Sequence, residues 1–327
     1  MMKKGLTPGV FNWIFVMLAG AVILLFFIKI IGVQTAITER EIGATVLSDT
    51  QTILSGRATS EDTQAIIKIP DKPFEFVCQE PCNLQTGCDS WFGIPGGELQ
   101  IQTPLQPIFS PRNIETAELY AFVIGWNVPF HTSNFLMLAQ PGMKIAFPSS
   151  AECNANVLCS DVFSQIPTPL KDRRIVVSGH IDNKNVRNIV FDDPMCSPTD
   201  NGGTTYCVDS STREITFPNL RTHSYYLAET IVAALFAEDS FAYECNLKKA
   251  FFRLSRVIEI YETKRTRLID DWGINPVCMQ NYLDLESDLI VIGNDYEVNS
   301  PVNFENAITL INQRNNIIRR NSCGSLY

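Results

Sequence analysis

The sequence predicts an α+β protein with a single transmembrane helix at its N-terminus, a β-rich disulfide-bonded ectodomain and a C-terminal α-helical subdomain. Three patterns predict this class. Residues 10–28 carry no formal charge and are mainly apolar. Residues 61–222 contain short alternating or β-branched runs separated by Pro and Gly, which are typical of strands. Residues 223–327 show helical periodicity. Apolar residues make up 45% of the 327 and charged ones 19%, which indicates a folded ectodomain rather than a disordered one.

The apolar run has the length of a membrane span. As a helix rising about 1.5 Å per residue, residues 10–28 would extend about 28 Å, close to the roughly 30 Å hydrocarbon core of a bilayer. A cleavable secretory signal is the alternative, because Lys3 and Lys4 precede the run. Secretory apolar regions are usually about 7 to 15 residues long, however, and end at a small-x-small site. We therefore expect a retained signal anchor, with residues 1–9 as a short cytoplasmic basic segment and residues 10–31 as the transmembrane helix.

The cysteines indicate the compartment of the remaining chain. All ten follow the apolar run, and disulfides between them would persist in an oxidising, extracytoplasmic space. Zinc is the alternative for the first three, but their spacing lacks the close pairs and nearby histidines of zinc modules. We expect disulfides, no metal and no other cofactor. The ten are Cys78, Cys82, Cys88, Cys153, Cys159, Cys196, Cys207, Cys245, Cys278 and Cys323.

One disulfide can be predicted from local geometry. Asn201-Gly202 is a strong two-residue hairpin turn, and counting outward from it places Cys196 opposite Cys207. Pro198 has no N–H and would interrupt the ladder between them. The pattern therefore predicts a Cys196–Cys207 disulfide rather than a regular hairpin. The sequence leaves the pairing of the other eight cysteines open.

A helical stalk is expected between the membrane and the ectodomain, over residues 32–60. Ile37, Ile42 and Val46 recur at helical spacing among charged residues, and Gly56 is a natural stop. The stalk is either a simple spacer or a packed, self-associating helix.

The β-rich domain over residues 61–222 is expected to contain long loops and no βαβ repeat. Residues 98–102 alternate strictly between polar and apolar, which predicts a sheet with one solvated face. The predicted strands are residues 74–78, 98–103, 118–124, 143–147, 174–178, 186–191 and 213–217.

Residues 223–327 are expected to form three or four helices. Residues 225–237 are apolar on most faces, which predicts burial, and a wide apolar stripe marks a longer helix from Tyr243 to about Trp272. Ser300 and Pro301 have the pattern of an N-cap followed by a first-turn proline, with a helix running on to Arg320. A disulfide at Cys323 would tie down the tail beyond that helix.

Candidate catalytic and ligand-binding residues are few. His180 and Asp182 would share one face of a strand and are candidates for a catalytic or metal-binding pair, the alternative being a solvated loop.

Trp126, Phe130 and His131 form an aromatic cluster that either lines a carbohydrate or peptide groove or belongs to the core. Asp192 and Asp193 supply oxygen ligands near residues 182–185, but this segment lacks the calcium-loop pattern. The net charge of −9 excludes a basic nucleic-acid-binding surface.

The N-terminus resembles a known class of export signal. Lys4-Gly5-Leu6-Thr7-Pro8, leading directly into the apolar run, resembles the class III signal of archaeal type IV pilin-like proteins. The resemblance implies processing after Gly5 and a filament in which the apolar helices form a central bundle. The partners it implies are the lipid bilayer and like subunits or other surface proteins, contacted through residues 10–55. We expect a cell-membrane protein with a non-enzymatic binding or assembly role, as a minor pilin-like surface subunit. The alternative is a membrane-anchored extracellular hydrolase or carbohydrate-binding enzyme.

Overall fold

A computed structural model divides the chain into two compact units, residues 1–49 and 50–327. In the first unit, residues 16–29 are helical. Most stalk residues, including Ile37, Ile42 and Val46, lie outside the described ranges. No helix within those ranges has both the length and the apolar character that crossing a membrane requires. The structure describes residues 13, 16–29, 48, 50–52, 56, 64–68, 73–83, 87–95, 100–103, 105–116, 118–166, 168–172, 176–179, 181, 186–198, 204–272, 275–294 and 300–327.

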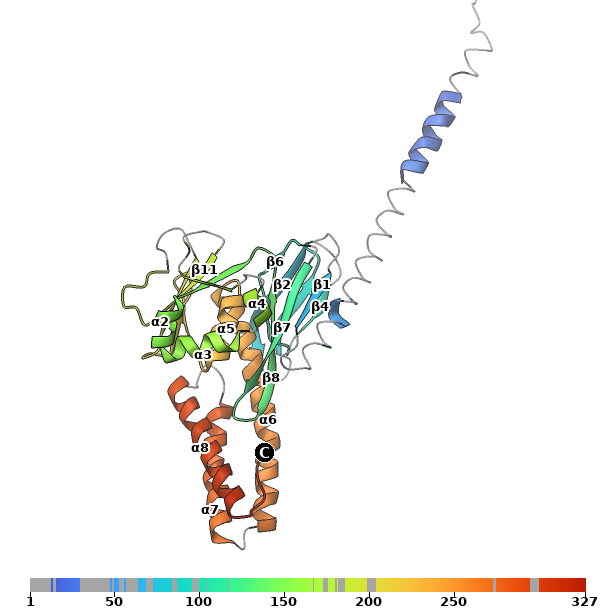
Figure 1. Ribbon diagram of the computed structural model, residues 1–327. Helices are drawn as coiled ribbons and strands as arrows, with labels where there is room; N and C mark the ends of the chain where they lie inside the picture. The colour runs from blue at the N-terminus through green and yellow to red at the C-terminus, as the bar shows by residue number, and fades with distance from the viewer. Residues whose placement is uncertain are drawn as a thin grey trace, which may run out of the picture. The chain divides into compact units, whose positions relative to one another are not determined.

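The second unit is a mixed α+β structure, as predicted. Within the described ranges its strands form three sheets, with orders β1-β7-β8-β5, β10-β9-β11-β12-β13-β14 and β4-β3-β2-β6 (Figure 1). The strands are β1 (Gln64–Lys68), β2 (Phe74–Asn83), β3 (Gly87–Gly93), β4 (Gln100–Gln102), β5 (Ile108–Phe109), β6 (Asn113–Ile114), β7 (Glu118–Asn127), β8 (His131–Ala139), β9 (Lys144–Phe147), β10 (Val176–Ser178), β11 (Val186–Phe191), β12 (Thr204–Asp209), β13 (Glu214–Thr216) and β14 (Thr222–Ser224).

The C-terminal helices follow the predicted pattern closely. Every residue from Thr230 to Phe236 is buried, as the apolar composition of this segment predicted. Pro301 opens the last helix, although Ser300 at the cap makes no side-chain capping hydrogen bond there. The helices are α2 (Ser150–Ala155), α3 (Val157–Gln165), α4 (Thr168–Asp172), α5 (Ala228–Phe236), α6 (Ser240–Trp272), α7 (Pro276–Gly293) and α8 (Pro301–Arg320).

The β-rich module contains no βαβ repeat in its described part, but it has one βαβ unit that the sequence did not predict. β9 leads through α2, α3 and α4 to its parallel neighbour β10. Local caps account for the short helices: Ser149 and Glu152 form a capping box on α2, and the Asn156 side chain accepts from the Cys159 amide at the start of α3. β11 also pairs in parallel with both β9 and β12.

The core joins the sheets to the helices through aromatic side chains. Trp126 of β7 is fully buried and stacks on Phe135 of β8, with ring centroids 5.5 Å apart. Phe251 of α6 and Phe304 of α8 pack against the same indole ring. The first half of α6 contacts β2, β3 and β8, and its later turns pack on α7, which pairs with α8 (Figure 1).

All ten cysteines form disulfides, which confirms the expectation that they pair with one another. Cys196 bonds to Cys207, the pair that the turn geometry predicted. Cys278 of α7 bonds to Cys323 and ties down the C-terminal tail. The remaining bonds are Cys78–Cys245, Cys82–Cys88 and Cys153–Cys159.

Candidate functional site

A cleft of about 770 Å³ opens beside α3, the β12–β13 turn and the first turns of α5 and α8. Its charged lining consists of four carboxyl groups and one guanidinium group, so we call it the acidic cleft. The carboxyl groups belong to Asp161, Asp192, Glu229 and Glu305, and the guanidinium belongs to Arg213.

Asp192 is held in place from two sides of the cleft. It follows β11 directly and has a left-handed backbone with φ of 53°, a conformation that Asp tolerates better than most residues. Its carboxylate accepts hydrogen bonds from the Ser210 amide at 2.7 Å and from Asn156 Nδ2 at 2.8 Å. Partial burial opposes ionisation, but these hydrogen bonds outweigh it and lower the pKa of Asp192. Asp192 therefore presents a fixed negative charge.

Arg213 is positioned by the turn between β12 and β13. The Asp209 side chain accepts from the amides of Ser211 and Thr212, at 2.8 and 3.2 Å, and this local pattern is typical of an Asx turn. Arg213 closes the turn with φ of 60° and forms an ion pair with Glu305 of α8. The turn thus brings the single basic group of the lining next to one of its acidic groups.

Glu229 differs from the other carboxyl groups of the lining. It is the second residue of α5, and burial raises its pKa above the ordinary value for glutamate. Asp192 has a lowered pKa in the same cleft. Two carboxyl groups whose surroundings move their pKa values apart can act as a proton donor and a fixed carboxylate.

The sequence predicted other residues for the functional site. His180 and Asp182 lie outside the described residues. Trp126 and Phe130 are 0% and 5% exposed, and Phe130 stacks on Tyr261 with ring centroids 3.8 Å apart. Both rings therefore belong to the core and offer no face to a carbohydrate or peptide, which corrects the groove interpretation. The third member of that cluster, His131, is exposed at the start of β8.

The acidic cleft was missed because its residues are far apart in the sequence. Asp192 was noticed only as a possible calcium ligand. One signal for Glu229 was present: it is the single charged residue in the segment 225–237, which is otherwise apolar or uncharged and was predicted to be buried. Glu229 is partly buried, and an acidic residue in such an apolar helix often has a partner or a function.

Comparison with known proteins assigns no relative. No protein-family model matches this sequence, and neither the curated proteins nor the solved structures contain a match. The function therefore has to be inferred from the residues of this chain.

Proposed function

We propose that this chain is a single-pass, membrane-anchored extracytoplasmic protein with a binding or assembly role, built as a minor pilin-like surface subunit. Residues 1–9 remain in the cytoplasm, residues 10–31 cross the cell membrane, and the bulk of the chain lies outside. The ectodomain offers the acidic cleft to its ligand.

The helical segment 16–29 carries the proposal. Every large apolar side chain from Val16 to Ile28 is between 55% and 76% exposed. Covering one such side chain contributes about 1.5 to 3 kcal/mol, so a helix that is apolar on all faces is stable only with apolar surroundings. Lipid, or the same helix from neighbouring subunits, would supply that cover.

The disulfides support the extracytoplasmic placement. Five bonds use all ten cysteines, and one of them joins residues 167 positions apart. Such bonds are rare where cytosolic reductants keep thiols reduced. The bonded part of the chain follows the apolar run, which agrees with an ectodomain beyond a membrane anchor.

The acidic cleft supports a binding role. Its volume of about 770 Å³ lies within the roughly 300 to 1,000 Å³ typical of small-molecule sites. Four carboxyl groups against one guanidinium favour a ligand with cationic or hydroxyl groups over an anionic one.

The deciding experiment is intact mass measurement and N-terminal sequencing of the protein from its native membrane, with thiol alkylation before and after reduction. A chain that begins at Leu6, with all ten thiols alkylated only after reduction, is the expected result. An unprocessed N-terminus would contradict the pilin-like assignment and leave a plain anchored ectodomain. Thiols that alkylate without reduction would contradict the extracytoplasmic placement.

Assembly can be tested separately. Charged substitutions at Ile37 and Ile42 should disturb association if the stalk packs against like subunits. Ile317 of α8, which is 42% exposed, provides a control outside the stalk. Crosslinking in the native membrane measures the effect, and unchanged association in the stalk variants would favour the spacer interpretation.

The anchored hydrolase remains a second candidate because of Glu229 and Asp192. Glycoside hydrolysis uses one carboxylic acid and one fixed carboxylate in the same site; both groups line the acidic cleft. The wild-type chain would then release nitrophenol from some member of a panel of nitrophenyl glycosides. Glu229→Gln or Asp192→Asn would lower that rate by about 10²-fold or more, with the fold intact. His180→Ala and Asp182→Asn serve as the corresponding variants of the pair predicted from sequence. No turnover by the wild type would argue against this candidate.

A further inference from the structure

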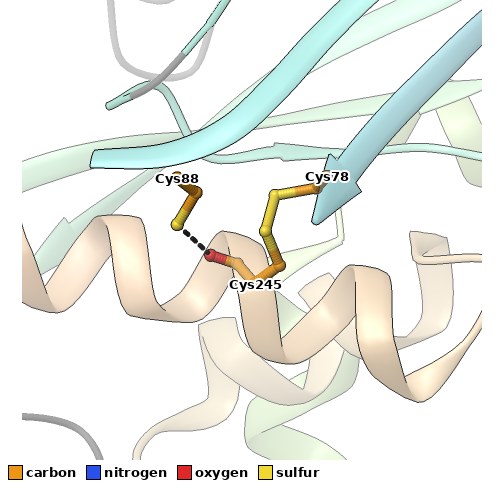
Figure 2. A group of neighbouring side chains, drawn as sticks. All are labelled: Cys78, Cys88 and Cys245. Atoms are coloured by element: carbon orange, nitrogen blue, oxygen red, sulfur yellow. Dashed lines mark hydrogen bonds between the residues drawn. A yellow bond between two sulfur atoms is a disulfide. The ribbon is translucent and has the colours of Figure 1, made fainter. Parts of the chain in front are cut away.

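Four cysteine sulfurs converge where the β2–β3 hairpin packs on α6. Cys78 and Cys82 come from β2, Cys88 from β3 and Cys245 from α6. Cys82 and Cys88 are register partners across the hairpin, and Figure 2 shows Cys88 beside the Cys78–Cys245 bond. We call these residues the four-sulfur cluster.

The two disulfides of the cluster are in contact. The Cys82 and Cys245 sulfurs lie 3.9 Å apart, although each is bonded to a different partner. The Cys88 sulfur lies 3.5 Å from the Cys245 carbonyl oxygen, and the sulfurs of Cys78, Cys88 and Cys245 all lie within 4.8 Å of one another. Outside this cluster, no three cysteine sulfurs meet this closely among the described residues.

A pocket gives access to one disulfide of the pair. The pocket has a volume of about 350 Å³, and Cys78 and Cys245 are part of its wall, whereas Cys82 and Cys88 are not. Cys78 is partly exposed and Cys245 is 2% exposed. Of the two bonded residues, Cys78 is therefore the more accessible to a small molecule in this pocket. The pocket also has three aromatic residues in its wall, Phe76, Trp91 and Phe241.

A basic side chain lines the same pocket. Lys249 lies one helical turn after Cys245 on α6, and its side chain is 1% exposed. Its Nζ donates to the Gln106 carbonyl at 3.2 Å and to Asn246 Oδ1 at 3.0 Å, which holds the amino group in place. In its protonated form, this amino group in the pocket wall would favour a thiolate over a thiol there.

We propose that the four-sulfur cluster is a thiol–disulfide exchange site that accepts electrons from a small dithiol bound in this pocket. This activity goes beyond the binding or assembly role and needs only the oxidising surroundings. One dithiol thiolate attacks the Cys78 sulfur, forming a mixed disulfide and releasing the Cys245 thiolate. That thiolate attacks the neighbouring Cys82 sulfur, forming Cys82–Cys245 and releasing the Cys88 thiolate.

The second thiol of the dithiol completes the exchange. It attacks the mixed disulfide at its own sulfur, so the reagent leaves as a disulfide and Cys78 is released as a thiol. The protein has then lost one disulfide and gained two thiols, at Cys78 and Cys88, while the dithiol has lost two thiols and gained one disulfide. The diagnostic product is the Cys82–Cys245 bond, which is absent from the starting structure.

The test treats the oxidised full chain with one equivalent of dithiothreitol. Acid quenching, alkylation and peptide mapping by mass spectrometry then identify every bond and every thiol. We expect a Cys82–Cys245 linked peptide together with alkylated Cys78 and Cys88, formed before the other disulfides open. If Cys78–Cys245 and Cys82–Cys88 open independently and no Cys82–Cys245 peptide forms, the cluster is purely structural and the proposal is overturned.

A variant tests the same contact without added reductant. Cys88→Ser leaves Cys82 as a thiol 3.9 Å from the Cys245 sulfur. Exchange should then yield a mixture of molecules, some with the Cys78–Cys245 bond and others with the Cys82–Cys245 bond. The matched control is Cys153→Ser, which leaves Cys159 as a thiol outside the cluster. We expect the exchanged bond at least about tenfold above any rearranged bond in the control. A single Cys78–Cys245 bond with a fully alkylated Cys82 would contradict the proposal. Should Cys88→Ser fail to fold, the wild-type experiment decides alone.

Discussion

The two halves of α6 are attached to their surroundings by different kinds of interaction. The first half is bonded to β2 through Cys245 and packs on the sheets with a buried Lys249. The second half packs on α7, where Arg265 of α6 forms an ion pair with Glu286 of α7 at 3.1 Å. Both halves also pack through apolar side chains of the core. The difference is that a covalent bond holds the first half, whereas a partly exposed ion pair adds little to the attachment of the second.

The largest expected effect comes from the aromatic contact that joins both regions. Phe304 is fully buried on α8 and packs against Trp126, Tyr226 and Phe251. Phe304→Ala should lower the free energy of unfolding by about 3 to 5 kcal/mol because it leaves a cavity. Urea unfolding followed by fluorescence and circular dichroism measures this. Ile317→Ala on the same helix is the control, with a loss below about 1 kcal/mol. Two separate transitions in the wild type would show that the halves unfold independently.

The tail disulfide should rank next. Replacing Cys278 and Cys323 together by Ser opens a bond between residues 45 positions apart, which should cost about 4 kcal/mol through the added entropy of the unfolded chain. The same change at Cys153 and Cys159, 6 positions apart, should cost only about 2 kcal/mol. Equal losses in urea unfolding would show that native contacts rather than loop length set the contribution.

Lys249 should make the stability of the sheet-side half depend on pH. Burial lowers the pKa of Lys249 to about 7 in the folded chain, below its ordinary value of 10.5. Between these values the unfolded chain binds the additional proton, so stability should rise with pH, by about 2 kcal/mol from pH 7 to pH 9. Lys249→Met should remove this rise. An equal rise in wild type and variant, measured by urea unfolding, would assign it to other groups.

The smallest effect is expected at the ion pairs of the bundle. Arg314 of α8 contacts Asp288 at 2.7 Å and Asp284 at 2.5 Å on α7. Arg314→Met should lower the free energy of unfolding by about 1 to 2 kcal/mol, since Asp288 is buried while Asp284 is partly solvated. Added salt should weaken the wild type more than the variant. A loss as large as that of Phe304→Ala would show that ion pairs hold the helices of the bundle as strongly as apolar packing does.

Local sequence patterns predicted much of the secondary structure. Each predicted strand coincides with an observed one, and Pro301 marks the start of α8 because its fixed φ suits a first helical turn. β8 was missed because it is buried along nearly its whole length and has no alternating pattern. α2 and α3 were missed because they are short and depend on caps at Ser149 and Asn156.

By itself, the sequence determined the α+β class, the buried α5 helix, the pairing of the cysteines in disulfides and the Cys196–Cys207 bond. These features depend on composition or on neighbours along the chain. Only the tertiary structure decided the parallel order of β9, β10, β11 and β12, the burial of Trp126, the acidic cleft and the four-sulfur cluster. Each of these depends on residues brought together from distant segments: Cys78 and Cys245 are 167 positions apart. No local period encodes such a contact, because it is set by how the sheets and α6 pack around one core.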